Sequence, residues 1–318
     1  MNIASLFERR SLLKAAAALG GLSTLFGRVR VAHADERSKD VGVEAPSGEA
    51  RMADIPFSPT AKVTVERRGQ IVLIGINRPY IHNRIDPEAY SGLAKAYYQY
   101  DHDPSLRAAV LFGHGDNFSR GIDVDAFQAI AASGRPRTTE DGTIDPLAKT
   151  NRLSKPLVVV VHGDTWNMGH ELHLAADIRV AAADTRFGQD ENTHGRFPGG
   201  GATIRFVHEA GWGNAMRYML TGDHWSAQEA LRMGVVQEIS PTPAAALETG
   251  IKFAEKIAAC GPLGIKTTLA SAHLAIDPSQ ADALSKLNAQ YGALYRTEDF
   301  KEGRKAEAEG RPPIYQGK

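Results

Sequence analysis

The sequence lacks several features that mark particular classes of protein. Cysteine occurs once, at Cys260, which excludes an internal disulfide and a multi-cysteine metal site but leaves the redox compartment undecided. Basic and acidic residues balance at 37 each, which argues against bulk electrostatic attraction to nucleic acid or to an anionic membrane. The GxSxG motif of serine hydrolases and the phosphate-binding P-loop are also absent. With 318 residues, 42% of them hydrophobic, an ordinary soluble enzyme is the default class.

The first 34 residues are typical of an export signal. Arg9 and Arg10 precede an alanine-rich apolar run that ends at Phe26, and residues 32–34 are small enough for signal peptidase. This pattern resembles a twin-arginine signal, so we expect the Tat export machinery as a partner and a periplasmic location. The apolar run is shorter than the roughly 20 residues that span a bilayer, which predicts a removed signal and no stable membrane anchor. The alternative is a fortuitous extension on a cytoplasmic protein.

The residues after this signal divide into three further regions. Residues 35–60 are rich in Gly, Pro, Glu, Lys and Ser without periodicity, which predicts a disordered linker. We expect the folded part to begin near Ala61, with a core over 61–242 and a helical region over 243–318. A helical region this apolar usually packs on something, often another subunit.

Strands and helices alternate along the expected core. Two β-branched runs flank Arg68-Gly69 and predict a hairpin, and Asp86-Pro87 caps a helix that continues to about Tyr100. The runs Arg107–Gly113 and Lys155–His162 predict buried strands, since the second contains four consecutive valines. The alternation favours an α/β architecture.

Two further segments have a distinct composition. Residues 131–145, rich in Gly, Thr, Arg and Pro, predict a mobile loop. After Thr242 no strand pattern remains, and the sequence predicts three helices there, over 244–259, 263–275 and 280–295.

Five short motifs in a fixed order carry a resemblance to a known family. They are FSRGID at 118–123, HG at 162–163, GHEL at 169–172 followed by ADI at 176–178, FGQDE at 187–191, and PGGGAT at 198–203. Together they resemble the crotonase superfamily, and most closely its enoyl-CoA hydratase branch. The likeness extends from about Ala61 to the C-terminus.

The resemblance implies a fold, an assembly and a ligand. The fold is a ββα spiral core with a helical C-terminal region used for trimer formation, commonly in a dimer of trimers. The ligand is an acyl-CoA thioester, so coenzyme A enters as part of the substrate and no separate cofactor is expected. Two backbone N–H groups polarise the thioester oxygen in this family, and they map onto Ile122 and Met168. Fixed donors in a dry site stabilise the charge that develops on an enolate oxygen. Met168 is also expected to begin a helix through Leu174, whose N-terminus adds partial positive charge at that oxygen.

Two glutamates resemble the pair that holds a water molecule in the hydratases. Glu171 lies in GHEL and Glu191 ends FGQDE. Adding water to an α,β-unsaturated thioester requires a base to take a proton from water and an acid to protonate Cα. By resemblance Glu171 is the base and Glu191 the acid. A glutamate on a helix is usually solvated, but the apolar neighbours of Glu171 argue against an exposed face.

The contacts to substrate are predicted from the same motifs and from departures from them. Tyr80-Ile81-His82 stands where many relatives have a basic residue, so Arg84 and Arg120 are expected to contact the phosphates in its place, and Arg120 could instead narrow the acyl entrance. Trp166 and His170 enlarge positions that are often small. The remaining predicted substrate or coenzyme A contacts are Gly121, Asp123, Gly169 and Tyr315, the last closing over the nucleotide of a neighbouring subunit.

Other functions stay open at this point. Double-bond isomerisation would use one carboxylate, while hydrolysis of a thioester or carbon–carbon cleavage of a β-diketone would use a different set of residues. The diketone reaction stays open because the sequence offers Asp190 and four histidines, His162, His170, His173 and His194. A metal at His170-Glu-Leu-His173 is weaker, because the spacing differs from HExxH and buried structural histidines explain the pattern. An exported binding protein without catalysis is the remaining alternative, because acyl-CoA is cytoplasmic whereas the signal directs the chain outward.

Overall fold

The computed structural model describes residues 61–134 and 141–316. The predicted export signal, the predicted linker and part of the predicted loop over 131–145 lie outside these residues. None of the described helices is long and apolar enough to cross a membrane.

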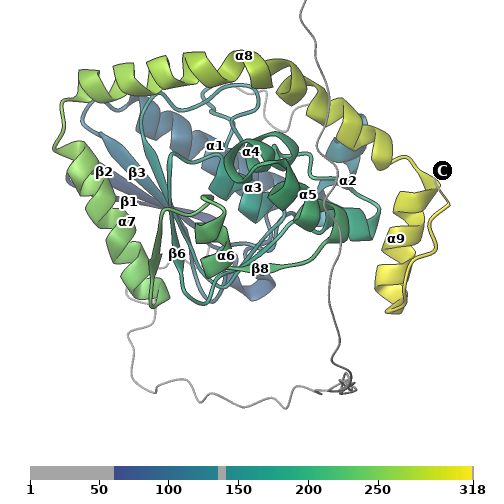
Figure 1. Cartoon of the computed structure of the whole chain (residues 1–318). Helices are drawn as coiled ribbons and strands as arrows, with labels where there is room; N and C mark the ends of the chain where they lie inside the picture. The colour runs from purple at the N-terminus through teal and green to yellow at the C-terminus, as the bar shows by residue number, and fades with distance from the viewer. Residues whose placement is uncertain (1–60, 135–140, 317–318) are drawn as a thin grey trace, which may run out of the picture. The chain divides into compact units, whose positions relative to one another are not determined.

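A six-stranded sheet forms the centre of the described fold. Its first two strands form the predicted antiparallel hairpin, in which Val63 pairs with Ile76, and each later neighbour is parallel. The strands lie in the order β1 (Val63–Arg68), β2 (Ile71–Ile76), β3 (Ala108–Gly113), β4 (Leu157–Val161), β6 (Ile178–Ala182) and β9 (Glu238–Ser240) (Figure 1).

A second, three-stranded sheet continues the turns of the first. It contains β5 (Asp164–Trp166), β7 (Arg186–Gly188) and β8 (Trp225–Ser226), with β7 in the middle. Strands β4 and β6 of the large sheet are each followed at once by a short strand of the small one. The chain therefore advances as a spiral in which successive turns stack on one another, and the loops between the paired strands gather at one edge.

The central strands β2, β3 and β4 of the large sheet are buried on both faces, as the four valines of β4 predict. Val158 and Val160 pack with Ala246 and Leu247 of α7 (Pro243–Ala258). Val159 and Val161 belong to a second cluster on the opposite face. That cluster includes Leu93 of α1 (Pro87–His102) and buried apolar residues of several later helices. Alternate side chains of a strand point to opposite faces, so β4 contributes to both clusters.

The start of α1 shows the predicted cap. The Asp86 carboxylate accepts a hydrogen bond from the Ala89 N–H at 2.8 Å, and Pro87 occupies the first helical position. The remaining helical segments before α7 are η2 (Pro79–Ile81), α2 (Val124–Ser133), α3 (Met168–Leu174), η3 (Glu191–His194), α4 (Ala202–Ala210), α5 (Trp212–Thr221) and α6 (Ala227–Arg232).

The prediction of separate helices over 263–275 and 280–295 is wrong. A single helix, α8 (Pro262–Leu294), runs through both ranges, and Figure 1 shows it as one bent, continuous coil. Proline removes a backbone donor and costs about 3 kcal/mol inside a helix, yet α8 continues through Pro278. Contacts of α8 with α2 and α4 tie it to the core, and tertiary contacts of this kind can outweigh a local penalty.

The last helix, α9 (Glu298–Glu309), packs against η3. The contact is close because two glycines face the opposite backbone. A Cβ on Gly303 would lie 2.6 Å from the His194 carbonyl oxygen, and one on Gly195 would lie 2.8 Å from that of Asp299. Helix α9 thereby fixes the turn that carries Glu191.

Candidate active site

A cavity of about 250 Å³ contains both predicted catalytic glutamates. It opens where α3 and η3 approach the loop before α2 and the glycine-rich turn before α4. Of the predicted site residues, its lining includes Arg84, Arg120, Ile122, Asp123, Met168, Glu171 and Glu191.

Glu171 is held by main-chain donors. It lies on α3, whose seven residues are all buried, and its own exposure is 3%. Its Oε1 atom accepts the N–H groups of Gly200 at 2.6 Å and Ala202 at 3.3 Å. A Cβ on Gly200 would overlap Glu171 Oε2, so only glycine leaves room for this carboxylate. Hydrogen bonds from backbone N–H groups stabilise the ionised form of a carboxyl group.

Glu191 has a different surrounding. It begins η3, is 5% exposed, and both of its carboxylate oxygens accept hydrogen bonds from Gln189 Nε2, at 3.0 and 3.1 Å. Burial raises the pKa of Glu191 well above its ordinary range, and the negative charges of Glu171 and Asp190 raise it further. Of the two carboxyls, Glu191 is therefore the one whose surroundings favour the protonated form.

The Gln189 amide that contacts Glu191 is itself oriented by a histidine. Gln189 Oε1 accepts a hydrogen bond from His170 Nδ1 at 2.6 Å. Burial lowers the pKa of His170 to about 4, so its ring is neutral and carries the proton on Nδ1. The three side chains form a chain of hydrogen bonds from the apolar core to the cavity.

The two predicted oxyanion donors point to the same cavity. The N–H groups of Ile122 and Met168 have no acceptor within residues 61–134 and 141–316. Gly121 brings them together, because a Cβ there would lie 3.5 Å from Met168 N in a backbone whose φ is +89°. Gly169 does not line the cavity but serves close packing, since its Cβ would overlap the Ser119 carbonyl oxygen.

The predicted coenzyme A contacts lie in three different settings. Arg84 is exposed at the cavity. Arg120 also lines it, but its Nε atom donates to Asp164 at 2.6 Å and its guanidinium stacks 4.7 Å from the centre of the Trp166 ring. Tyr315 donates to the Thr193 carbonyl oxygen at 2.8 Å in its own chain, and its predicted contact with a neighbouring subunit stays a prediction.

Asp123 directly precedes α2, and its carboxylate lies 3.6 Å from Arg78 Nη2.

Several residues at the cavity were not singled out in the sequence. Asn167 has a φ of +52°, which is rare outside glycine, and its side chain exchanges two hydrogen bonds with Asp190, at 2.8 and 3.0 Å. The sequence analysis also did not identify three further residues of the site individually: Gly200, Gln189 and Arg196. The triple glycine signalled a close approach, and Gln189 stands within a quoted motif, but Arg196 gave no signal.

Of the four histidines suggested for other chemistry, His162, His170 and His173 are buried, whereas His194 lines the cavity. His170 and His173 are fully buried beside Phe187, Phe206 and Trp225. Neither ring nitrogen of His173 has a hydrogen-bond partner among the described side chains, and burial lowers its pKa well below the ordinary value. No group of three or more His, Cys, Asp or Glu in the described part of the chain is arranged to hold a metal ion.

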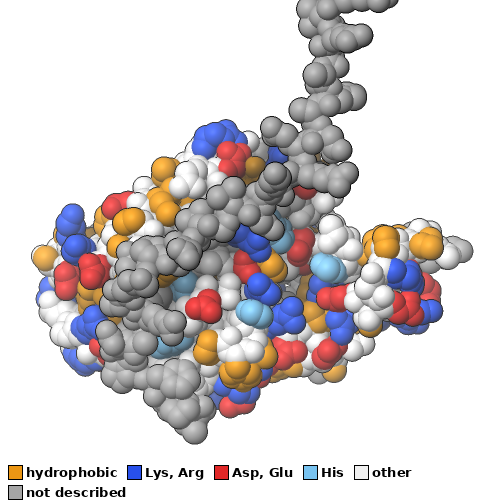
Figure 2. All heavy atoms as spheres, turned by 90° about the horizontal axis from the view of Figure 1, so that it is seen from below, with side chains coloured by type: hydrophobic (Ala, Val, Ile, Leu, Met, Phe, Trp, Pro, Cys, Tyr) orange, Lys and Arg blue, Asp and Glu red, His pale blue; other side chains and the backbone are white. Residues whose placement is uncertain are grey.

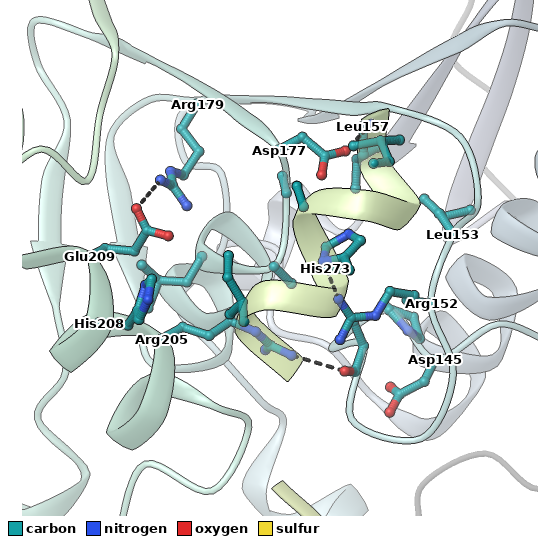
Figure 3. Close-up of a pocket in the computed structure, with 18 of the residues that line it drawn as sticks. Asp145, Arg152, Leu153, Leu157, Asp177, Arg179, Arg205, His208, Glu209 and His273 are labelled. Carbon is teal, nitrogen blue, oxygen red and sulfur yellow. Dashed lines mark hydrogen bonds and ion pairs between the residues drawn. The ribbon is translucent and has the colours of Figure 1, made fainter. Parts of the chain in front are cut away.

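A second hollow, of about 380 Å³, lies apart from the predicted site residues (Figure 3). Its charged side chains bond within the protein: Arg179 pairs with Glu209 at 2.8 Å, and Arg152 contacts His273 at 2.5 Å. Arg205 lines this hollow and is also close enough to Glu171 to feel its charge. Burial lowers the pKa of Arg205, and the negative charge of Glu171 partly opposes that effect. Arg205 therefore places a positive charge near Glu171, and none of the predicted ligand contacts lines the second hollow.

The face of the molecule in Figure 2 shows no large patch of one sign of charge. Basic, acidic and histidine side chains are interspersed there, as the equal numbers of basic and acidic residues suggest.

Comparisons with known proteins agree with this geometry. A family model described as enoyl-CoA hydratase/isomerase matches residues 66–318. The enoyl-CoA hydratase EchA19 of Mycobacterium tuberculosis is 33% identical over 275 residues, covering 84% of this chain and 100% of that protein. The (E)-benzylidenesuccinyl-CoA hydratase of Thauera aromatica is 31% identical and covers 80% of this chain and 99% of its own.

Solved structures give the same result. A probable enoyl-CoA hydratase/isomerase from Mycobacterium abscessus is 40% identical with a TM-score of 0.66, covering 81% of this chain and 99% of that one. A carnitinyl-CoA hydratase from Mycobacterium avium is 28% identical with a TM-score of 0.71 and the same coverage. The predicted α/β crotonase fold with C-terminal helices is thus confirmed, and the chain belongs to the enoyl-CoA hydratase/isomerase family of the crotonase superfamily.

Proposed function

We propose that the protein adds water across the double bond of a trans-2-enoyl-CoA thioester and forms a 3-hydroxyacyl-CoA. The observation that carries the proposal is a pair of buried carboxyls at one cavity, with Glu171 held by main-chain donors and Glu191 in surroundings that raise its pKa. Hydration requires one group of each kind. The names of the M. tuberculosis and T. aromatica relatives, both hydratases of CoA thioesters, support the same reaction.

Each group has a defined task in this mechanism. Glu171 takes a proton from water as the water oxygen attacks Cβ. The electrons of the double bond move toward the thioester, whose oxygen receives the N–H groups of Ile122 and Met168. Glu191 then gives its proton to Cα. The product is the 3-hydroxyacyl thioester. Glu171 is then protonated and Glu191 ionised, and a proton transfer through water returns both carboxyls to their starting forms.

The oxyanion donors contribute because they are fixed before the charge develops. Neither N–H has an acceptor among the described residues, so neither must break a protein hydrogen bond to meet the thioester oxygen. One such donor is typically worth about 2.7–4 kcal/mol of transition-state stabilisation. Exposed Arg84 and the nearby Arg120 are the proposed contacts for the coenzyme A phosphates.

Direct assay of hydration tests the proposal. Purified protein without residues 1–34 is mixed with crotonyl-CoA, and the loss of enoyl-thioester absorbance is followed beside Glu171→Gln and Glu191→Gln. We expect turnover by the parent and a loss of about 10²–10⁴ in kcat for each variant, because each removes one proton-transfer group.

The outcomes separate hydration from its alternatives. If one of the two variants keeps parental activity, the reaction uses a single carboxylate, as isomerisation would. If the folded parent turns over neither crotonyl-CoA nor a longer trans-2-enoyl-CoA, hydration is not its reaction.

A further inference from the structure

Four arginines line the cavity of the two glutamates, and three of them are accounted for. Arg120 pairs with Asp164. Arg304, on α9, pairs with Asp125 and lies 3.0 Å from Glu307. Arg84 is exposed, so water solvates its charge. The fourth, Arg196, makes no ion pair with any described residue, and its side chain lines the cavity.

The position of Arg196 is fixed by its backbone. Its N–H donates to the Glu191 carbonyl oxygen at 2.9 Å and closes the turn of η3. Gly195, the residue before it, has a φ of +67° and lies against the backbone of Asp299 and Phe300 in α9. The backbone of Arg196 is therefore held at the cavity wall.

The Arg196 side chain is largely enclosed by the protein where it lines the cavity. Its exposure is 8%, and its Nε atom is buried with no hydrogen bond. Its guanidinium makes no ion pair with any residue that the structure describes. A guanidinium stays charged in proteins, and burying an unpaired charge is strongly unfavourable. An arginine in this state indicates that a partner arrives from outside the chain.

The acids nearest to Arg196 do not supply that partner. The charge of Arg196 lowers the pKa of Glu191, but burial and the charges of Glu171 and Asp190 outweigh it, so that the pKa stays raised and the neutral form is favoured. The Asp190 carboxylate is bound by Asn167 Nδ2 at 2.8 Å and by His224 Nε2 at 3.2 Å. Glu307 is engaged by Arg304. A negative charge on the ligand would give Arg196 the acid partner that the described residues do not provide.

We propose that the acyl chain of the natural substrate carries a carboxylate, and that Arg196 binds it. This deepens the hydration proposed above and rests on it. The planar fork of a guanidinium matches the two oxygens of a carboxylate. Because Arg196 follows Glu191 by five residues and lines the same cavity, the carboxylate lies only a few carbons beyond the reacting double bond.

The arrangement makes Arg196 a specificity-determining residue. A dicarboxylic acyl chain pairs the buried cation, whereas an uncharged chain of equal length leaves it desolvated and unpaired. Sites built around a buried polar group reject ligands that cannot satisfy it more strongly than apolar pockets reject an extra methylene.

A matched pair of substrates tests this. One is trans-2-hexenedioyl-CoA, with a terminal carboxylate, and the other is trans-2-hexenoyl-CoA, of the same length without it. We expect the parent to prefer the first in kcat/KM by at least about tenfold, and Arg196→Gln to lose about tenfold to a hundredfold on it while changing about threefold or less on the second. Arg196→Lys should fall between, because it keeps the charge without the fork. The control is Arg217→Gln, an equal change at an exposed arginine of α5.

Binding without turnover separates this proposal from hydration itself. Adipyl-CoA and hexanoyl-CoA have saturated chains, so their affinities can be compared by calorimetry whether or not the protein hydrates anything. Tighter binding of adipyl-CoA by the parent, lost in Arg196→Gln, supports the carboxylate site. Equal affinities in the parent, or an equal loss on both hexenoyl substrates in Arg196→Gln, would overturn it, since the second result assigns Arg196 only to the support of Glu191.

Discussion

The two glutamates of the cavity are held by different parts of the molecule. Glu171 takes its hydrogen bonds from the backbone of Gly200 and Ala202. Glu191 takes its hydrogen bonds from the side chain of Gln189, which His170 orients in turn. The first arrangement depends on the path of the chain, and the second on the identity of two buried side chains.

This difference predicts how each glutamate responds to substitution. Backbone donors persist under most side-chain changes, so Glu171 is vulnerable only where a new atom alters the path or fills the space beside it. Glu191 is open to change at every member of its hydrogen-bond chain, but each change is smaller because the carboxyl itself stays in place.

The largest expected effect comes from filling the space beside Glu171. In Gly200→Ala the new Cβ overlaps Glu171 Oε2 and displaces the carboxylate. A displacement on the order of 1 Å can cost about 100-fold in rate, which is the loss we expect in kcat on crotonyl-CoA. Gly213→Ala is the control, because a Cβ there meets nothing within 4 Å. Activity within about threefold of the parent in Gly200→Ala would show that Glu171 does not need this backbone.

The next effect concerns stability and pH at Glu191. Its pKa is raised in the folded chain, so below about pH 4.5 folded and unfolded chains are both protonated there. As the pH rises, the unfolded chain ionises while the folded carboxyl keeps its proton, and stability falls until the folded pKa is reached. Glu191→Gln removes this loss, so its stability relative to the parent should rise with pH by up to about 1.4 kcal/mol per pH unit.

Urea unfolding of both proteins at several pH values between 4.5 and 8 measures this difference. A constant difference across the range would mean that Glu191 ionises in the folded protein as it does in the unfolded chain.

The smallest effect is expected at His170. His170→Leu removes the donor to Gln189 Oε1, and a single hydrogen bond is worth about 0.5–1.5 kcal/mol, or about twofold to tenfold in kcat. A freer Gln189 amide stabilises ionised Glu191 less, so its pKa rises further and the fall of kcat at high pH moves to higher pH.

His170→Asn is the matched variant, because its amide places a donor near the position of Nδ1. It should retain more activity than His170→Leu and keep the parental pH profile. Identical kcat and pH profiles in all three proteins would remove His170 from any role at Glu191.

Much of the fold follows from local sequence signals. The hairpin at Arg68-Gly69, the cap at Asp86 and the four valines of β4 each depend on neighbours within a few residues, and the structure confirms all three. The break predicted between residues 275 and 280 was wrong, because the tertiary contacts of α8 are not visible in the local sequence.

The site was predictable only as far as its motifs reach. The motifs placed Glu171, Glu191, Ile122 and Met168 at one cavity, where the structure also places them. They did not identify Gly200 as a donor to Glu171, since that contact joins positions 29 residues apart. Arg196 was missed for a related reason, because its significance lies in the absence of a nearby acid partner, which a sequence does not display.

The packing of α9 on η3 has a consequence for how the protein is made. Ribosomes release the N-terminal part of a chain first, so the spiral sheet can form before residues 298–309 emerge. Until then the wall that holds Gly195, and with it Glu191 and Arg196, lacks its support, and Arg304 and Glu307 are missing from the cavity. The cavity is thus completed by a helix near the C-terminal end of the fold, and a chain interrupted before α9 would have Glu171 and Glu191 but not the finished enclosure around them.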